Sequence, residues 1–253
     1  MNKNIIIGNW KMNLKINSSQ KLIKDIQRNL GQKDFENCNI IVCPSNIHLE
    51  NVKSKIKTKI SLGCQNLFWE KDGAYTGEIS TSMMKNIGCK YAIIGHSERR
   101  IYLNETNEMI NKKIKACQEN NITPILCIGE SASQRKNNKT KLFIKKQILS
   151  AYKGIDIKKF KNIIIAYEPI WAIGSSNPAC PEDANEVATY IKNLLSDSYK
   201  NISENTISVL YGGSVNAKNI NSFMNMNEID GSLVGGESIK STGFVGIIKN
   251  SYK

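Results

Sequence analysis

The sequence predicts an α/β protein folded as a single-domain (β/α)8 barrel, and three observations lead to this prediction. The chain has 253 residues, a length that one barrel commonly uses. Eight short apolar runs recur along it, each rich in Ile, Val and Leu and without polar alternation. Longer polar segments with helical spacing separate these runs. We therefore expect one barrel domain over residues 1–253, with an open doubly wound sheet as the alternative.

The apolar runs are typical of strands buried on both faces, as in parallel sheets. With their first residues, they are NIIIGNW (Asn4), NIIVCP (Asn39), ISLGCQN (Ile60), YAIIGHS (Tyr91), ITPILCIGE (Ile122), NIIIAYEP (Asn162), TISVLYGG (Thr206) and IDGSLVGG (Ile229). Eight strands with helices between them favour a closed barrel. No GxGxxG follows the first run, which weakens a dinucleotide-binding interpretation.

Helical spacing is clear in three of the intervening segments. Apolar residues between 14 and 30 mark one face, and Gly31 is the expected stop. Residues 139–152 repeat the pattern. A third helix is expected to begin at Pro181, because proline followed by two acidic residues is a favourable helix start.

The net charge of +13 can arise from scattered surface lysines, a nucleic-acid surface or a field that favours small anions. The lysines are spread along the whole chain, without a basic block interleaved with aromatic residues. This pattern disfavours nucleic-acid binding. An anionic substrate would suit the charge.

The cysteines indicate a reducing compartment. There are seven, an odd number, without a CxxC pair, and several lie in apolar runs where a thiol packs as a small buried group. With only two histidines, no zinc-site spacing is present. The first apolar stretch is too short for a signal peptide, and no stretch reaches the roughly 18 residues that span a bilayer. We expect a soluble, cytoplasmic protein without membrane contact or metal.

Polar and glycine residues cluster where the predicted strands end. In a barrel these ends meet on one face, where such enzymes carry their chemistry. The clusters are Gly8-Asn9-Trp10-Lys11, Gly95-His96-Ser97-Glu98, Glu168-Pro169, Tyr211-Gly212-Gly213-Ser214 and Gly235-Gly236. Residues far apart in sequence are thus expected to converge.

Glu168 directly follows the buried run IIIAY. It can be a solvated loop residue or part of a structural ion pair, but apolar surroundings make a carboxylate a stronger base. We therefore predict that Glu168 is a catalytic base. The segment WAIGSS after it could close over a ligand and exclude water.

Two further side chains are candidates on the same face. His96 precedes SERR and is expected at a helix N-terminus, where the positive end of the helix favours a neutral imidazole that can donate to a carbonyl. Lys11 can be one more surface lysine, but with Asn9 it can face the barrel mouth and supply a fixed positive charge. His48, in PSNIHLEN, is interpreted as a structural residue on a helix.

Glycine pairs follow the last two predicted strands. Gly212-Gly213-Ser214 and Gly235-Gly236 expose backbone N–H groups and let an anion approach closely. One pair is weak evidence, but two at adjacent late strands match the place where barrels commonly bind phosphate. A small phosphorylated substrate is therefore predicted.

Together these segments closely resemble the triosephosphate isomerase family, from Asn9 to the C-terminal region. The shared runs, in the family's order and spacing, are GNWKMN, QNLFWEKDGAYTGEIS, GHSERR, PILCIGE, AYEPIWAIG, YGGSV and DGSLVGG. The resemblance implies a TIM barrel that interconverts dihydroxyacetone phosphate and D-glyceraldehyde 3-phosphate through an enediolate, in glycolysis and gluconeogenesis. It implies neither cofactor nor metal.

The resemblance also implies roles for individual residues. Glu168 is similar to the family's proton-abstracting base and His96 to its neutral electrophile. Asn9 and Lys11 correspond to substrate contacts, with Glu98 holding Lys11. Cys127 resembles a packing residue near the base. The residues that resemble phosphate-gripping positions are Gly174, Ser214, Gly235 and Gly236.

Members of the family are usually homodimers. The corresponding loop here is 65–78, and the resemblance implies that Thr76 reaches the Asn9 and Lys11 region of a partner subunit.

Two departures from the family pattern stand out. The segment 174–179 reads GSSNPA where the family usually reads GTGKTA, so Ser176 and Pro178 narrow the allowed backbone angles and predict a stiffer hinge. Glu237 follows the phosphate glycines where the family generally has alanine. Its carboxylate either repels phosphate or points outward and caps the last helix, and we favour the outward orientation.

Two other functions compete with the isomerase. A synthase or Schiff-base aldolase on the same scaffold would need a lysine in a late strand, and the last three runs contain none. A non-catalytic binding protein would have lost the base or the histidine. Glu168, His96, Lys11 and Asn9 are all present.

Overall fold

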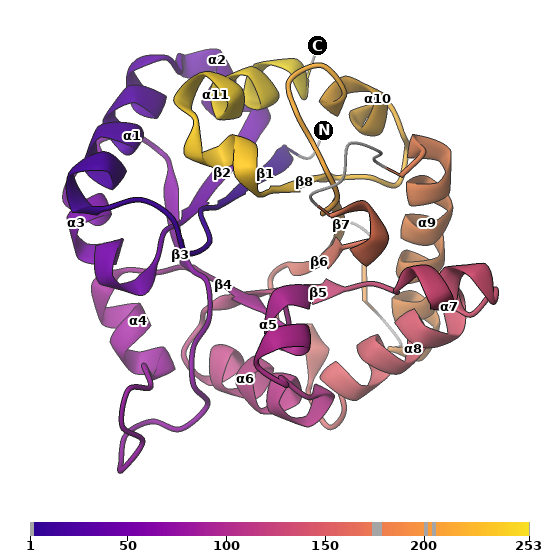
Figure 1. Cartoon of the computed structure of the whole chain (residues 1–253). Helices are drawn as coiled ribbons and strands as arrows, with labels where there is room; N and C mark the ends of the chain where they lie inside the picture. Colours follow the sequence, from indigo (N-terminus) through magenta and orange to yellow (C-terminus); the bar gives the residue numbers. More distant parts are fainter. Residues whose placement is uncertain (1–2, 174–178, 200–201, 204–205, 253) are drawn as a thin grey trace.

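A computed structural model describes residues 3–173, 179–199, 202–203 and 206–252, and its eight strands close into a barrel ringed by helices (Figure 1). The strands are β1 (Asn4–Asn9), β2 (Cys38–Cys43), β3 (Ser61–Cys64), β4 (Tyr91–Ile94), β5 (Thr123–Ile128), β6 (Ile163–Tyr167), β7 (Ile207–Tyr211) and β8 (Gly231–Val234). Each pairs in parallel with the next, and β1 also pairs with β8. The predicted (β/α)8 barrel is confirmed.

The helices lie outside the barrel. They are α1 (Ile16–Arg28), α2 (Gln32–Asn37), α3 (Leu49–Lys53), α4 (Thr81–Ile87), α5 (Ser97–Tyr102), α6 (Asn107–Glu119), α7 (Ala132–Lys136), α8 (Thr140–Ala151), α9 (Pro181–Ser198), α10 (Ile220–Met224) and α11 (Ser241–Asn250). Short 3-10 turns are η1 (Asn46–His48), η2 (Ile157–Lys159), η3 (Ile170–Ala172) and η5 (Gly236–Ile239). The helices predicted from Pro181 and over residues 139–152 are confirmed as α9 and α8.

The first helix differs from its prediction at both ends. Leu14 has a φ of 73°, a left-handed conformation outside the helix, so α1 begins only at Ile16. The helix ends at Arg28, and Gly31 is not its stop. Instead Gly31 precedes α2, where its N–H donates to the Asp34 carboxylate at 2.7 Å and so starts the next helix.

His48 lies in the 3-10 turn η1 and is buried, with Nε2 3.3 Å from the Leu14 carbonyl oxygen. This contact supports the structural role that we expected.

Six of the seven cysteines are buried free thiols, and Cys180 is exposed.

Two apolar layers support the strand ends. Side chains inside the barrel form a small cluster, and those on the outer face of the strands pack against the helices. The inner cluster comprises Ile5, Ile7, Ile41, Cys43, Ile93, Ile125, Cys127, Ile164, Ala166, Leu210 and Leu233. The barrel is therefore a filled core that fixes where each strand ends.

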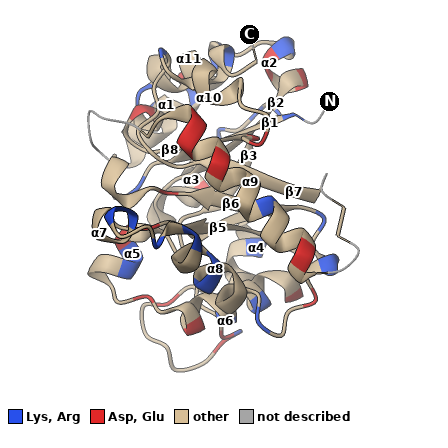
Figure 2. Ribbon diagram, turned by 90° about the vertical axis from the view of Figure 1, so that its right-hand side faces the viewer, with Lys and Arg blue, Asp and Glu red and all other residues tan. Residues whose placement is uncertain are grey.

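Charged positions are dispersed over the exterior. Figure 2 shows Lys and Arg interspersed with Asp and Glu on the helices of one side, in agreement with the even spread of lysines in the sequence. None of the described helices combines the length and the apolar character that a membrane span requires.

Candidate active site

The carboxyl ends of β1, β4, β6, β7 and β8 surround one cavity of about 480 Å³. It is lined by Asn9, Lys11, His96, Glu168, Ile173, Gly212, Gly213, Ser214, Val215, Asn216, Leu233, Gly235, Gly236, Glu237, Ile239 and Lys240. The structure therefore brings together Asn9, Lys11, His96 and Glu168 with both glycine pairs, whereas Glu98 contacts Lys11 but does not line this cavity. Gly174 and the departures at Ser176 and Pro178 lie outside the described residues.

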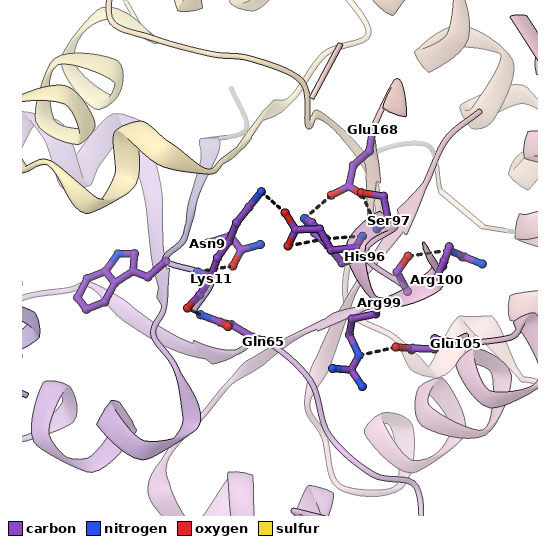
Figure 3. Close-up of polar contacts among 12 residues, drawn as sticks. Asn9, Lys11, Gln65, His96, Ser97, Arg99, Arg100, Glu105 and Glu168 are labelled. Carbon is purple, nitrogen blue, oxygen red and sulfur yellow. Dashed lines mark hydrogen bonds and ion pairs between the residues drawn. The ribbon is translucent and has the colours of Figure 1, made fainter. Parts of the chain in front are cut away.

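Glu168 directly follows β6 and is 2% exposed. Its backbone N–H donates to the Ile128 carbonyl oxygen at 2.7 Å, which extends the sheet pairing by one residue. Its Oε2 accepts from the Ser97 N–H at 3.0 Å, and its Oε1 lies 3.1 Å from His96 Nε2 (Figure 3). One hydrogen bond and one close contact to His96 thus hold a buried carboxylate at the cavity wall.

Glycines make room for this carboxylate. A Cβ atom at Gly212 would lie 2.8 Å from Glu168 Cγ and 3.1 Å from the Tyr167 carbonyl oxygen. The Gly212 N–H donates to that same carbonyl at 2.7 Å. Gly212 is therefore a packing requirement of Glu168, in addition to any contribution to anion binding.

His96 is the N-cap of α5, as its sequence position predicts, and is 6% exposed. Its Nδ1 accepts a hydrogen bond from the Glu98 backbone N–H at 3.2 Å. An accepting Nδ1 carries no proton, so the neutral ring carries its proton on Nε2. That nitrogen faces the cavity and Glu168 (Figure 3).

Lys11 reaches the cavity from a constrained backbone. Its φ is 51°, and its carbonyl oxygen accepts from Ser45 Oγ at 2.8 Å and Gln65 Nε2 at 2.9 Å. Its backbone N–H donates to Asn9 Oδ1 at 3.1 Å. The ammonium lies 2.5 Å from Glu98 Oε1. Backbone and side chain are thus both anchored, and the ammonium position is well defined.

At the opposite end, the loops after β7 and β8 line the cavity with Gly212, Gly213, Gly235 and Gly236, together with larger residues such as Val215 and Ile239. A Cβ at Gly236 would meet nothing within 4 Å, and one at Gly235 would lie 3.4 Å from Lys11 Cε. Ser214 Oγ donates to the Ala172 carbonyl oxygen at 2.9 Å, and so links the loop after β7 to the segment after β6. This end can accept a ligand's anionic group without displacing a side chain.

Glu237 directs its carboxylate toward α11. Its Oε1 lies 2.8 Å from Lys240 Nζ, and its Oε2 faces Gly243 in the first turn of that helix. The N-cap of α11 is Lys240, whose side chain makes no cap hydrogen bond, and the Glu237 carboxylate accepts from Lys240 Nζ instead of from a backbone N–H of the helix. The expected cap is therefore wrong, and an ion pair takes its place.

Cys127 lies in the barrel interior. Burial raises the pKa of its thiol, and the nearby Glu168 carboxylate raises it further. The side chain therefore stays protonated and packs, as expected.

Among the described residues, no three His, Cys, Asp or Glu side chains are grouped so as to hold a metal ion.

Sequence reasoning missed three supporting groups. Ser97 supplies the N–H that binds Glu168, while Ser45 and Gln65 hold the Lys11 carbonyl. Ser97 could have been found because it follows His96 in the same run. The other two come from different strand ends, and nothing in their local sequence links them to Lys11.

Comparisons with known proteins agree with one another. The family model described as triosephosphate isomerase matches residues 4–251. The triosephosphate isomerase of Dictyoglomus thermophilum is 46% identical over 251 residues, 99% of this chain and 100% of that protein. Those of Alkaliphilus oremlandii and Endomicrobium trichonymphae are 45% and 42% identical, each over 98% or more of both chains.

Proposed function

The chain belongs to the triosephosphate isomerase family, and from this premise we propose how its cavity interconverts dihydroxyacetone phosphate and D-glyceraldehyde 3-phosphate. The observation that carries the proposal is the pairing of a buried Glu168 carboxylate with His96 Nε2 at 3.1 Å. A base and a hydrogen-bond donor thus lie side by side at the wall of one cavity. The reaction needs these two groups together.

Glu168 takes the proton from the carbon next to the substrate carbonyl. Such a proton is weakly acidic, so the base works best where water does not solvate its charge. At 2% exposure, Glu168 meets this condition. Returning the same proton to the adjacent carbon completes the isomerisation, so the carboxylate is regenerated in each turnover.

His96 polarises the carbonyl while neutral. Its proton is on Nε2, because Nδ1 accepts the Glu98 N–H. As Glu168 removes the carbon-bound proton, negative charge develops on the carbonyl oxygen, and the Nε2–H donates to it. Lys11, anchored by Glu98, adds a positive charge beside the same oxygen, and Asn9 orients the substrate at the barrel mouth.

The phosphate binds at the ends of β7 and β8. We assign it to the backbone N–H groups of Ser214, Gly235 and Gly236, and to Gly174, which lies outside the described residues. The open space at Gly236 supports this assignment. The enediolate would lose phosphate readily in water, so exclusion of water is part of the function.

A coupled isomerase assay on purified protein tests this proposal. Glu168→Gln keeps the shape of the side chain and removes the base, and we expect kcat to fall by about 10³-fold or more. Glu119→Gln, on the exposed end of α6, is the matched control and should retain full activity. An inactive wild type, or a fully active Glu168→Gln, would overturn the proposal.

We further propose a homodimer in which Thr76 of the partner subunit lies near Asn9 and Lys11. Residues 70–78 are all exposed and project from the barrel before α4 (Figure 1). A second cavity of about 530 Å³ beside Lys11 could accept this loop. Large apolar side chains are exposed in or next to the segments that line it, among them Met12 (95%), Ile47 (78%), Tyr102 (76%) and Leu103 (59%).

Sedimentation measures this association. Thr76→Arg places a charge on an exposed loop, so the fold should be retained while the dimer dissociation constant rises at least tenfold. A wild-type protein that is monomeric and fully active at micromolar concentration would contradict the dimer.

We also propose that residues 1–253 form one catalytic domain that works in the cytoplasm, which the buried free thiols support.

A further inference from the structure

Glu237 and Lys240, here called the rim pair, line the phosphate end of the active-site cavity. Glu237 belongs to η5, which connects β8 to α11, and Lys240 directly precedes α11. Their Oε1 and Nζ atoms lie 2.8 Å apart. The proposed proton transfer uses neither residue, so the pair needs another explanation.

Lys240 is the more exposed of the two lysines among the described residues that line this cavity. The lining includes two lysines, and the ammonium of Lys11 already lies 2.5 Å from Glu98 with a side chain 27% exposed. The Lys240 side chain is 64% exposed. A lysine on a flexible stem at the edge of a phosphate site is a potential phosphate ligand.

Glu237 holds this ammonium on the α11 side. One carboxylate oxygen contacts Lys240, and the other faces Gly243, where the missing side chain leaves room for it. The first turn of α11 is also the positive end of a ten-residue helix, which favours a carboxylate there. The carboxylate therefore has one ion pair, with Lys240, and a favourable electrostatic position beside the start of α11.

We propose that Glu237 is an affinity-determining residue of the phosphate subsite, because it keeps Lys240 over α11 and away from the bound phosphate. The inference rests on the proposed function of that subsite. With Lys240 withheld, the dianion is bound by the backbone amides assigned to it above. Substrate, product and intermediate carry the same phosphate, so a change in this contact alters their binding uniformly and appears in KM rather than kcat.

The effect should be moderate in size. Exposed ion pairs are weak, and salt screens them further. A dianion therefore competes for Lys240 even in the wild type, and releasing the lysine should improve affinity by about threefold rather than by orders of magnitude.

A double-mutant cycle tests the proposal. We expect Glu237→Gln to lower KM for D-glyceraldehyde 3-phosphate about threefold at low salt, with kcat changed less than twofold. In the Lys240→Met background the same substitution should lower KM by less than 1.5-fold, because no ammonium is left to release. Glu237→Asp, which keeps the charge, should stay near the wild type.

Two results would overturn the proposal. Equal gains in both backgrounds would mean that the carboxylate acts alone by repelling phosphate. An unchanged or raised KM in Glu237→Gln would mean that it does not restrain Lys240. Titration of the four proteins of the double-mutant cycle with inorganic phosphate, followed by calorimetry, should repeat the pattern without turnover. A failure of this inference is thereby distinguished from a failure of the isomerase proposal.

Discussion

The two ends of the active-site cavity are built from different parts of the chain. At the catalytic end, after β4 and β6, the groups are the buried side chains of His96 and Glu168, each with defined hydrogen-bond partners. At the phosphate end, after β7 and β8, they include glycine backbone, and of the charged side chains beside it Lys11 and Glu237 are half-buried and Lys240 is exposed. The difference indicates that function at the catalytic end depends on side-chain atoms held in defined positions, whereas function at the phosphate end depends on space left open for the ligand.

Burial explains the contrast. A carboxylate taken out of water must be compensated by polar partners: the Ser97 N–H donates a hydrogen bond to Glu168, and His96 Nε2 lies 3.1 Å from its other oxygen. A site for a phosphate, by contrast, must be empty before the ligand arrives. Glycine satisfies this need, because it offers its N–H without filling space.

Gly212→Ala is the sharpest test of this difference between the two ends of the cavity. Gly212 follows β7, at the phosphate end, but the substitution should disturb Glu168 at the catalytic end. The new methyl would lie 2.8 Å from Glu168 Cγ, so it should displace the base. A displacement near 1 Å can lower a rate by about 100-fold, and we expect that loss in kcat with a smaller change in KM. Steady-state kinetics measures both.

Gly31→Ala is the matched control, because its new methyl would have only Asp34 Oδ2 within 4 Å, at 3.9 Å. Overpacking at Gly212 should also cost about 1–3 kcal/mol of unfolding free energy, visible in denaturant melts. If Gly212→Ala raised KM and left kcat unchanged, Gly212 would belong to the phosphate end alone, and the contrast would be drawn in the wrong place.

A second substitution should have the opposite signature. Gly236→Ala adds a methyl where nothing lies within 4 Å, so the fold should keep its melting temperature. The methyl occupies space proposed for the phosphate, and we expect KM to rise about tenfold with kcat within about threefold, as for lost uniform binding. An unchanged KM would show that the phosphate lies elsewhere in the cavity.

The sequence allowed the fold and the main side chains of the site to be predicted. Strand ends of a parallel barrel share one face, so residues 9, 11, 96 and 168 could be brought together from strand order alone. His96 at a helix start was equally readable, since a polar residue after an apolar run precedes SERR.

Contacts that cross the barrel could not be predicted in this way. Two such contacts are the hydrogen bond from Gln65 to the Lys11 carbonyl oxygen and the space that Gly212 leaves for Glu168. Both depend on distances between strands, which the hydrophobic periodicity of the sequence does not specify. The outcome at Glu237 shows the same limit. The negative charge of Glu237 was evident from the sequence. Whether its carboxylate faces the phosphate, caps α11 or pairs with Lys240 depends on the orientation of η5.

The smallest effect concerns the contact that joins the two ends. Ser214 Oγ donates to the Ala172 carbonyl oxygen, four residues after Glu168, at 2.9 Å. Ser214→Ala removes this bond and keeps the proposed phosphate-binding N–H, so about 1 kcal/mol of positioning is lost. We expect kcat/KM to fall about fivefold.

Ser222→Ala removes a similar hydrogen bond on the exposed part of α10 and should change nothing. If the loss in Ser214→Ala lay wholly in KM, the contact would serve the phosphate alone. A share in kcat would mean that the backbone end helps to hold the chain that carries the base.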